Sequence, residues 1–107
     1  MPELPEVETT RRGIEPHVAG RTLTAVTVRE PRLRWPVDAR VAELRDRRII
    51  GLRRRAKYLL MDLGELHLGI HLGMSGTLRV VAADTPLRKH DHIDLHLDSG
   101  QLLRFND

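Results

Sequence analysis

A proline directly after the initiator methionine gives this chain a candidate nucleophile. The sequence opens Met1-Pro2-Glu3-Leu4-Pro5-Glu6-Val7-Glu8, and aminopeptidases usually remove methionine when the second residue is small. Removal exposes the secondary amine of Pro2, and an α-amino group titrates near roughly pH 8. Attack of this amine on an aldehyde gives a charged iminium, which is an electron sink for covalent catalysis.

Glutamates surround the candidate amine. Pro5 is favoured as a first helical residue, so we expect Glu6 in a first helical turn and Glu3 just before it. One carboxyl group could donate a proton to a leaving group, if burial raised its pKa, while the other oriented the site. The alternative is ordinary N-terminal capping, because the helix dipole favours carboxylates in a first turn. The residues alone leave both interpretations open.

Five short segments stand out by their residue types and their order. They are Pro2-Glu3-Leu4-Pro5-Glu6-Val7-Glu8-Thr9 with Arg11-Arg12-Gly13-Ile14, then Arg32-Leu33-Arg34-Trp35-Pro36, Arg54-Arg55-Ala56-Lys57-Tyr58-Leu59, His71-Leu72-Gly73-Met74-Ser75-Gly76 and Lys89-His90-Asp91-His92. In sequence, order and spacing they resemble the N-terminal part of bacterial formamidopyrimidine-DNA glycosylase, the base-excision enzyme for oxidised purines. The resemblance covers the chain from first residue to last. It implies a two-layer β-sandwich with the first helix packed along it.

Composition limits the possible classes of protein independently of this resemblance. With 107 residues and 40% hydrophobic content, the chain predicts one domain with a modest core. Lys and Arg number 18 against 15 Asp and Glu, and the net charge of +3 suggests a polyanionic partner. The absence of cysteine excludes disulfides and thiolate metal sites in this chain. No apolar run approaches the roughly 20 residues of a membrane span, and the acidic start is no signal peptide. We expect a cytosolic protein with no membrane partner.

The pattern along the chain predicts a mainly β fold. Residues 7–19 indicate a helix with Val7, Ile14 and Val18 on one buried face, closed by Gly20. Alternating β-branched residues from Thr22 to Arg29 predict a strand. A short helix is expected over 37–44, and further strands over 49–54, 57–63, 65–72, 77–82, 93–97 and 101–105. Many short strands with Gly, Asp and Pro between them favour an antiparallel sandwich or barrel.

A basic segment runs from Arg45 to Lys57. On strands, alternate arginines would share a face and could follow a phosphate backbone. A merely solvated sheet face is the alternative. By resemblance to the family, Lys57 contacts the phosphates at the lesion and assists catalysis.

Two histidines and a methionine follow on the next predicted strand. His67 and His71 are four residues apart, so they face one side of a strand, with Leu68 and Ile70 on the other. Met74 then sits on a glycine-bounded turn, where a methionine usually packs back into the core. By resemblance, Met74 is instead the wedge that fills the space of an extruded base, and His71 holds a nearby phosphate.

A row of polar residues near the C-terminal end could bind a metal. His90, His92, Asp94 and His96 alternate with apolar residues, a spacing that can converge on a divalent ion. Such alternation is also what any amphipathic strand shows. The family resemblance assigns only His90 a role, in contact with DNA phosphate, and we expect no metal in this chain.

The resemblance implies a bifunctional DNA glycosylase and abasic-site lyase that removes 8-oxoguanine and formamidopyrimidines from double-stranded DNA. Pro2 would attack the sugar, Glu3 would supply protons and Glu6 would organise the site. Lys57, His71 and His90 would position the bent backbone. The resulting iminium would allow successive β- and δ-eliminations at the abasic site. We expect the protein to act as a monomer.

The family continues beyond the position of Asp107 with an Arg- and Phe-bearing segment, a helix-two-turn-helix module and a four-cysteine zinc finger. This sequence contains only the part that resembles residues of the N-terminal catalytic domain, so no cofactor is expected in it. A fragment, a truncated frame or a degenerate copy would each fit. We expect weaker DNA binding and slower turnover from this part alone, because phosphate contacts supply much of the affinity.

Two other classes of protein remain. A truncated, inactive fragment could bind DNA weakly through its basic face without chemistry, and replacement of Pro2 by Gly would then change nothing. Tautomerases also use an N-terminal proline, as a general base, but in them a strand begins at the proline. Here Pro5-Glu6 opens a helix.

Overall fold

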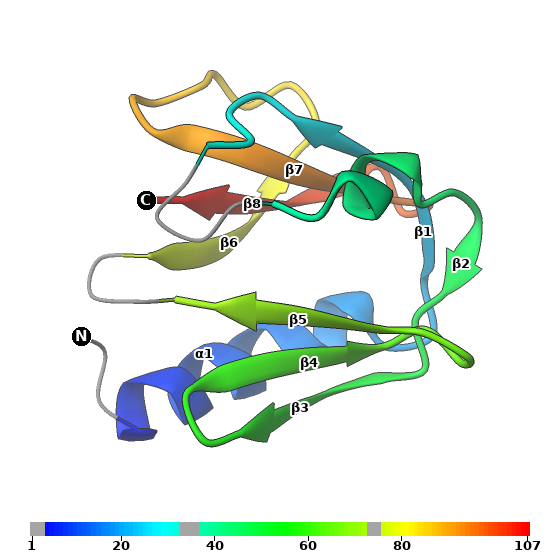
Figure 1. Cartoon of the computed structure of the whole chain (residues 1–107), viewed down its shortest axis with the longest axis vertical. Coiled ribbons are helices and arrows are strands. Elements are labelled where there is room, and N and C mark those ends of the chain that lie inside the picture. The colour runs from blue at the N-terminus through cyan, green and yellow to red at the C-terminus, as the bar shows by residue number, and fades with distance from the viewer. Residues whose placement is uncertain (1–3, 33–36, 73–75) are drawn as a thin grey trace.

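The computed structural model describes residues 4–32, 37–72 and 76–107. They form two antiparallel sheets, with one long helix alongside (Figure 1). The elements are α1 Leu4–Val18, β1 Thr22–Val28, the 3-10 helix η1 Ala39–Glu43, β2 Arg47–Arg48, β3 Gly51–Arg55, β4 Tyr58–Asp62, β5 His67–His71, β6 Thr77–Ala82, β7 Asp91–Leu97 and β8 Gln101–Asn106. This architecture confirms the predicted two-layer, mainly β fold with an N-terminal helix. No helix among the described residues is long and apolar enough to cross a membrane.

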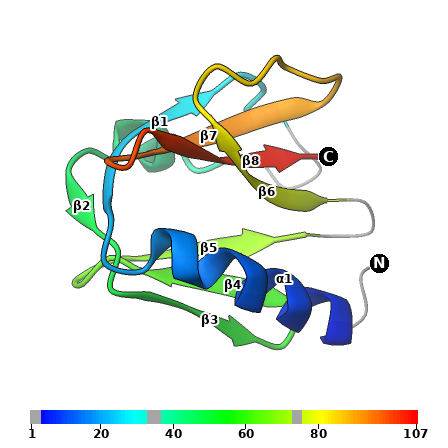
Figure 2. The ribbon, with the colours of Figure 1, turned by 180° about the vertical axis from the view of Figure 1, so that it is seen from behind.

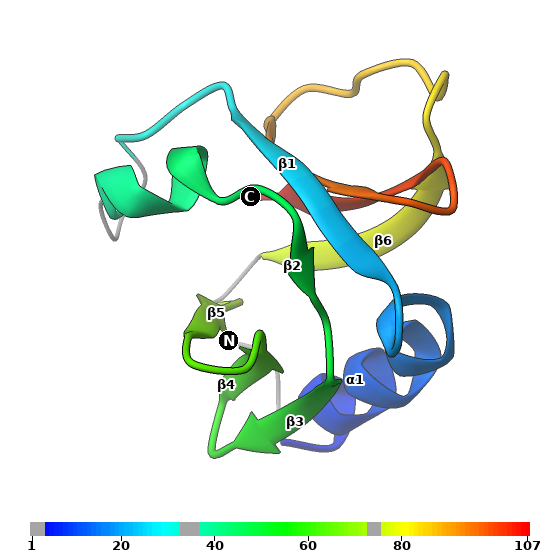
Figure 3. The same ribbon diagram turned by 90° about the vertical axis from the view of Figure 1, so that its right-hand side faces the viewer.

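The two sheets differ in size. The larger has the strand order β2-β1-β7-β8-β6, and the smaller has the order β3-β4-β5. Figure 2 shows α1 running along the smaller sheet. In the side view of Figure 3, the larger sheet lies above, and the smaller sheet and α1 lie below it. The chain therefore changes from the larger sheet to the smaller one after β2 and returns after β5.

The core fills the space between these layers. Helix α1 contributes Val7, Ile14 and Val18, all at most 4% exposed, as their spacing of about two and one helical turns predicted. The larger sheet contributes seven apolar side chains, which are Leu23, Val26, Leu78, Leu95, Leu97, Leu103 and Phe105. The strands of the smaller sheet contribute three, which are Leu52, Leu59 and Met61. Burial of this shared face holds the helix and both sheets in fixed positions.

The helices differ from the predicted ranges at their ends. Helix α1 begins at Leu4, three residues before the predicted start, because proline is well tolerated in a first helical turn. It stops before Gly20, whose φ of 80° suits glycine. The expected helix over 37–44 is only the 3-10 turn of η1, since the Asp38 side chain accepts from the N–H of Arg40 and Leu44 is already extended.

The basic segment is divided between the two sheets. Strand β2 pairs Arg48 with Thr22 and Arg47 with Leu23 of β1, whereas β3 pairs with β4. The predicted single strand over 49–54 is therefore shorter at its start, and Ile49 and Ile50 form the crossing between the sheets. Ile49 is fully buried there.

Candidate active site

The first turn of α1 brings a carboxylate to the candidate site. Glu6 is exposed in this turn, as predicted. Pro2 and Glu3 immediately precede the helix, and with Met74 they lie outside the described residues. Of the predicted site residues, the structure therefore describes Glu6, Lys57, His71 and His90.

Glu8, two residues further on, ties the start of the helix to the smaller sheet. Its carboxylate accepts hydrogen bonds from Arg11 and Arg12, at 2.7 Å and 2.9 Å, and lies 3.4 Å from Nε of Arg54 in β3. The hydrogen bonds from Arg11, with help from Arg12, lower the pKa of Glu8 to about 2. Glu8 is therefore ionised at any physiological pH and holds three guanidinium groups together.

Two further contacts fasten α1 to β3 along the edge of the sheet. Glu15 accepts a hydrogen bond from the N–H of Leu52 at 3.1 Å, and Arg11 donates to the carbonyl of the same residue at 3.3 Å. These side chains satisfy backbone groups that an edge strand would otherwise expose. The helix and the strand thus form one unit.

Lys57 lies on the tight turn between β3 and β4. Ala56 before it adopts a φ of 52°, in the left-handed region that a residue with a side chain rarely occupies. Nη1 of Arg54 donates to the Ala56 carbonyl at 2.9 Å, which stabilises the turn. Because Arg54 also faces Glu8, a single side chain connects the lysine turn with the first turns of α1.

His71 is the last residue of β5 and lies beside this turn. Its cross-strand partner is Tyr58, the residue after Lys57, and the two rings are 4.7 Å apart between centroids. His67 pairs with Asp62 at the other end of the same strands, with 3.7 Å between nitrogen and oxygen. The prediction that both histidines face one side is confirmed, and the structure brings only His71 close to the lysine turn.

The connection from β5 to β6 is closed by glycine. The N–H of Gly76 donates to the carbonyl of Leu72 at 2.7 Å. A Cβ at position 76 would lie 2.2 Å from that carbonyl oxygen, so the position has no room for a side chain. Gly76 therefore allows the chain to pass close to Leu72 just before β6 begins.

His90 lies on the turn that leads into β7. It is exposed, has a φ of 71°, and its carbonyl accepts from the N–H of Asp107 at 3.1 Å. The next residue, Asp91, is 5% exposed and accepts from the N–H of Arg88 at 2.7 Å and from Asn106 at 2.8 Å. Burial raises the pKa of Asp91, but these hydrogen bonds outweigh it and keep the pKa below its usual value.

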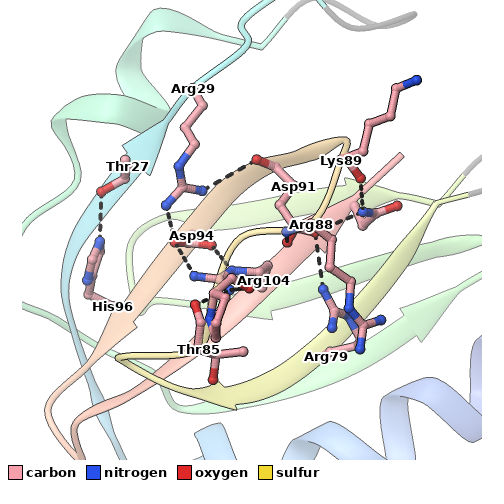
Figure 4. Close-up of polar contacts among 12 residues, drawn as sticks. Thr27, Arg29, Arg79, Thr85, Arg88, Lys89, Asp91, Asp94, His96 and Arg104 are labelled. Atoms are coloured by element: carbon pink, nitrogen blue, oxygen red, sulfur yellow. Dashed lines mark hydrogen bonds and ion pairs between the residues drawn. The ribbon is translucent and has the colours of Figure 1, made fainter.

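A buried ionic cluster lies next to this turn (Figure 4). Asp94 is 1% exposed and accepts two hydrogen bonds from Arg104 and one from Arg29. Burial alone would raise its pKa, yet the two guanidinium groups lower it to about 2. Arg104 also donates to the carbonyl of Thr85 at 3.0 Å, so the cluster fixes the β6–β7 connection to the sheet.

The polar row that suggested a metal site is used for other contacts. Asp94 is paired with arginines, His96 lies 2.7 Å from the Thr27 hydroxyl, and His92 lies 3.0 Å from the Asp107 carbonyl. Among the described residues, no three His, Asp or Glu side chains are grouped to hold a metal ion. Asp94 is also buried rather than on a solvated face, because the β6–β7 connection covers it.

The described site residues gather at one end of the sandwich. Figures 1 and 2 show the start of α1, the β3–β4 turn, the end of β5 and the end of β8 on the same side. Strand pairing places Tyr58 beside His71 in one sheet, and Asp91 beside Asn106 in the other. Four segments that are distant in sequence therefore present Glu6, Lys57, His71 and His90 at a common end.

Three supporting residues were not predicted from the sequence. Arg54 holds the lysine turn, while Asp91 and Asn106 hold the His90 turn, where Asn106 also donates to the Lys89 carbonyl at 2.9 Å. Arg54 is one of several arginines in a row, and nothing in its type distinguishes it. The role of Asp91 could have been predicted from its place after Lys89-His90, because Asp near a turn commonly accepts a hydrogen bond from a backbone N–H.

Comparison with known proteins identifies the family. The family model described as the formamidopyrimidine-DNA glycosylase N-terminal domain matches residues 1–107. The formamidopyrimidine-DNA glycosylase of Alcanivorax borkumensis is 70% identical over 107 residues, and that of Escherichia coli O1:K1 / APEC is 53% identical over 107 residues. Both alignments cover all of this chain and 40% of the relative. The chain thus spans about two fifths of the length of these relatives.

Solved structures agree with this assignment. The Lactococcus lactis formamidopyrimidine-DNA glycosylase bound non-covalently to DNA containing an abasic (AP) site has a TM-score of 0.86 and 36% identity, and the match covers 99% of this chain and 40% of that one. A complex of the Lactococcus lactis protein with DNA containing Fapy-dG has a TM-score of 0.87 and 34% identity, covering 98% and 40%. The chain belongs to the formamidopyrimidine-DNA glycosylase family, and its residues 1–107 match the N-terminal domain of that family.

Proposed function

We propose that residues 1–107 are the N-terminal catalytic domain of a base-excision DNA glycosylase with abasic-site lyase activity. The substrates are oxidised purines, 8-oxoguanine and formamidopyrimidines, in double-stranded DNA, and abasic sites themselves. The protein works as a monomer in the bacterial cytosol. Relatives of this family in complex with abasic-site DNA and with Fapy-dG DNA support this choice of substrate.

The first step replaces the bond between base and sugar. With Met1 removed, the Pro2 nitrogen attacks C1′ of the extruded nucleotide, and the C1′–N bond to the base breaks. Glu3 supplies the proton that the departing base needs. The resulting carboxylate then takes the proton that the Pro2 nitrogen loses after its attack, and passes it to O4′ as the sugar ring opens. The product is an iminium that joins Pro2 to C1′.

The iminium then cleaves the DNA strand. Its positive charge acidifies the C2′ hydrogen, so loss of that proton expels the 3′ phosphate by β-elimination. Loss of a further sugar proton expels the 5′ phosphate by δ-elimination, and water hydrolyses the iminium to free the Pro2 amine. Each leaving phosphate departs with its electron pair, and no metal or external oxidant is needed.

The other site residues act on the DNA backbone and on the gap in the stack. Glu6 organises the site beside Glu3, and Lys57 contacts the phosphates at the lesion. His71 and His90 hold neighbouring phosphates of the bent strand. Met74 fills the space that the extruded base leaves.

The convergence of the described site residues is the observation that carries this proposal. Glu6, Lys57, His71 and His90 come from four separate segments, and the paired strands bring those segments to the end of the molecule where α1 begins. A basic lysine and two histidines there suit a bent phosphate backbone. Arg54, Asp91 and Asn106 hold the turns that carry Lys57 and His90.

A product assay tests the proposal. The chain is incubated with a labelled duplex containing one formamidopyrimidine, and the strand products are resolved together with the released base. We expect base release and a one-nucleotide gap with phosphate at both ends. The Glu3→Gln variant should lose base release. Binding of the duplex with no release of base, and no cleavage of an abasic duplex, would show that the chain is a DNA-binding fragment without chemistry.

A further inference from the structure

We infer that the outer face of β3-β4-β5 is a second contact surface for the DNA backbone, on which Arg53 and Arg55 bind phosphates next to His71. This inference rests on the proposed function and extends its DNA contacts beyond the predicted residues. It gives a role to two arginines of the basic segment, because the sequence alone could not show which of its arginines face DNA. The partner is the phosphate backbone of the strand that His71 contacts.

Strand register places these side chains on one face. Arg55 pairs with Tyr58, which pairs with His71, while Arg53 pairs with Leu60. Directly paired residues of antiparallel strands point to the same side, and so do alternate residues of one strand. The buried residues Leu52, Leu59 and Met61 occupy the opposite side, against the core.

The same register removes Arg54 from this surface. Arg54 points to the core side of β3, where it meets Glu8 of α1 and the Ala56 carbonyl. Arg53 and Arg55 are exposed, and their guanidinium groups have no partner among the residues that the structure describes. The guanidinium groups of Arg53 and Arg55 are therefore available on the outer face, whereas that of Arg54 binds Glu8 and the Ala56 carbonyl.

The rest of the face suits an anionic partner. Tyr58 is 49% exposed and presents its ring beside that of His71. The acid of this face among the described residues, Asp62, lies at the far end of β4 and is 3.7 Å from His67. Positive charge is thus concentrated at the end of the strands that carries Lys57 and His71.

The spacing matches a nucleic-acid strand. Alternate residues of a strand are separated by about 6.6 Å, since each residue advances about 3.3 Å. One strand of DNA advances about 3.4 Å along the axis for each phosphate, so alternate residues span about two phosphate steps. Long arginine side chains at 53 and 55 can therefore reach phosphates next to the one held by His71.

Protection of an edge strand is the competing explanation for arginines on β3. Charged residues on an edge discourage pairing with other strands. Here α1 already covers the edge of β3 at Leu52, whose carbonyl and N–H bind Arg11 and Glu15. The outward arginines are not needed to block this edge.

The salt dependence of binding tests the surface. Affinity of the full 107-residue chain for a duplex with a tetrahydrofuran abasic analogue is measured by fluorescence anisotropy from 20 to 200 mM KCl. The variants are Arg53→Gln, Arg55→Gln and the double variant. Arg48→Gln is the matched control, because Arg48 is also exposed but lies on β2 in the other sheet.

The salt dependence shows whether Arg53 and Arg55 bind DNA phosphates. The slope of log K against log salt is negative, and we expect its magnitude to decrease by about 0.9 for each single variant and by about 1.8 for the double variant. Arg48→Gln should leave it unchanged. Unchanged slopes in the double variant, with a parent chain that binds, would refute the surface and leave the proposed function intact. A parent chain that fails to bind the duplex even at 20 mM salt would overturn both.

Discussion

Asp94 is a buried carboxylate whose charge depends on two arginines. Its pKa of about 2 lies below the ordinary value of about 3.9. The stabilisation from its ionised form is therefore complete above about pH 4 and is lost as pH falls towards 2. We predict that Asp94→Asn lowers the free energy of unfolding by about 3 kcal/mol or more at pH 7, since it leaves Arg104 buried without a carboxylate.

Urea unfolding at pH 7, 4 and 2.5 checks this prediction. The parent chain should lose stability between pH 4 and 2.5, and the Asp94→Asn variant should lose less over that interval. Asp98→Asn is the control, because Asp98 is exposed in a turn between β7 and β8. Equal losses for the parent and Asp94→Asn would mean that Asp94 is not the source of the acid sensitivity.

Gly76 occupies a position that has no room for a side chain. Because an added Cβ would overlap the Leu72 carbonyl oxygen, Gly76→Ala must move the backbone of the β5–β6 connection. We predict a loss of stability of roughly 1–3 kcal/mol. Gly13→Ala in α1 is a matched control, since nothing lies within 4 Å of its added Cβ, and it should raise stability by about 0.5–1 kcal/mol. Thermal unfolding of both variants distinguishes them, and a tolerated Gly76→Ala would refute the steric account.

At the scale of elements, the contact between α1 and the β3–β4 turn positions two parts of the proposed site. Arg54 reaches both Glu8 and the Ala56 carbonyl, and Ala56 holds an unfavourable φ. We predict that Arg54→Gln increases the hydrogen exchange of the Ala56 and Lys57 amides by about tenfold. Global stability should change by roughly 1 kcal/mol or less, as expected for a partly exposed ion pair.

Amide exchange followed by NMR gives this measurement, with Arg53→Gln as the control on the same strand. Arg53 faces away from α1, so its removal should leave the turn unchanged. Glu8→Gln should reproduce part of the effect, because it removes the other end of the contact. If Arg53→Gln and Arg54→Gln had the same effect on the turn, the link through Arg54 would be wrong.

The elements also show what the sequence can predict. The spacing of Val7, Ile14 and Val18 located the buried face of α1, and β6 was predicted with its observed bounds, Thr77–Ala82. Local patterns suffice in such cases because each element has one apolar face. The sheet crossing at Ile49 depends on backbone hydrogen bonds to Gly20 and Arg21, which are distant in sequence and which no local pattern contains.

The candidate site was predictable only in part. Its residues came from resemblance to a family, and the structure adds how Glu6, Lys57, His71 and His90 reach a common end. The division of roles among Arg53, Arg54 and Arg55 was not predictable, because it depends on which face of β3 meets α1. Burial of Asp94 was missed for a similar reason, since a distant connection covers an otherwise polar row.

At the scale of the whole molecule, the site belongs to no single layer. The helix and the smaller sheet bring Glu6, Lys57 and His71, and the larger sheet brings His90. The shared core fixes these layers to each other. In the proposed chemistry, the amine of Pro2 would react with a sugar while residues of both sheets would hold the phosphates around it.

Borohydride trapping shows whether Pro2 is the nucleophile that attacks the sugar. The purified chain is mixed with an abasic-site duplex and sodium borohydride, and the modified residue is identified by mass spectrometry. We predict a reduced covalent adduct on the Pro2 nitrogen, in a chain that has lost Met1. A folded chain that lacks Met1 and forms no adduct, or forms it only on a lysine, would contradict the account.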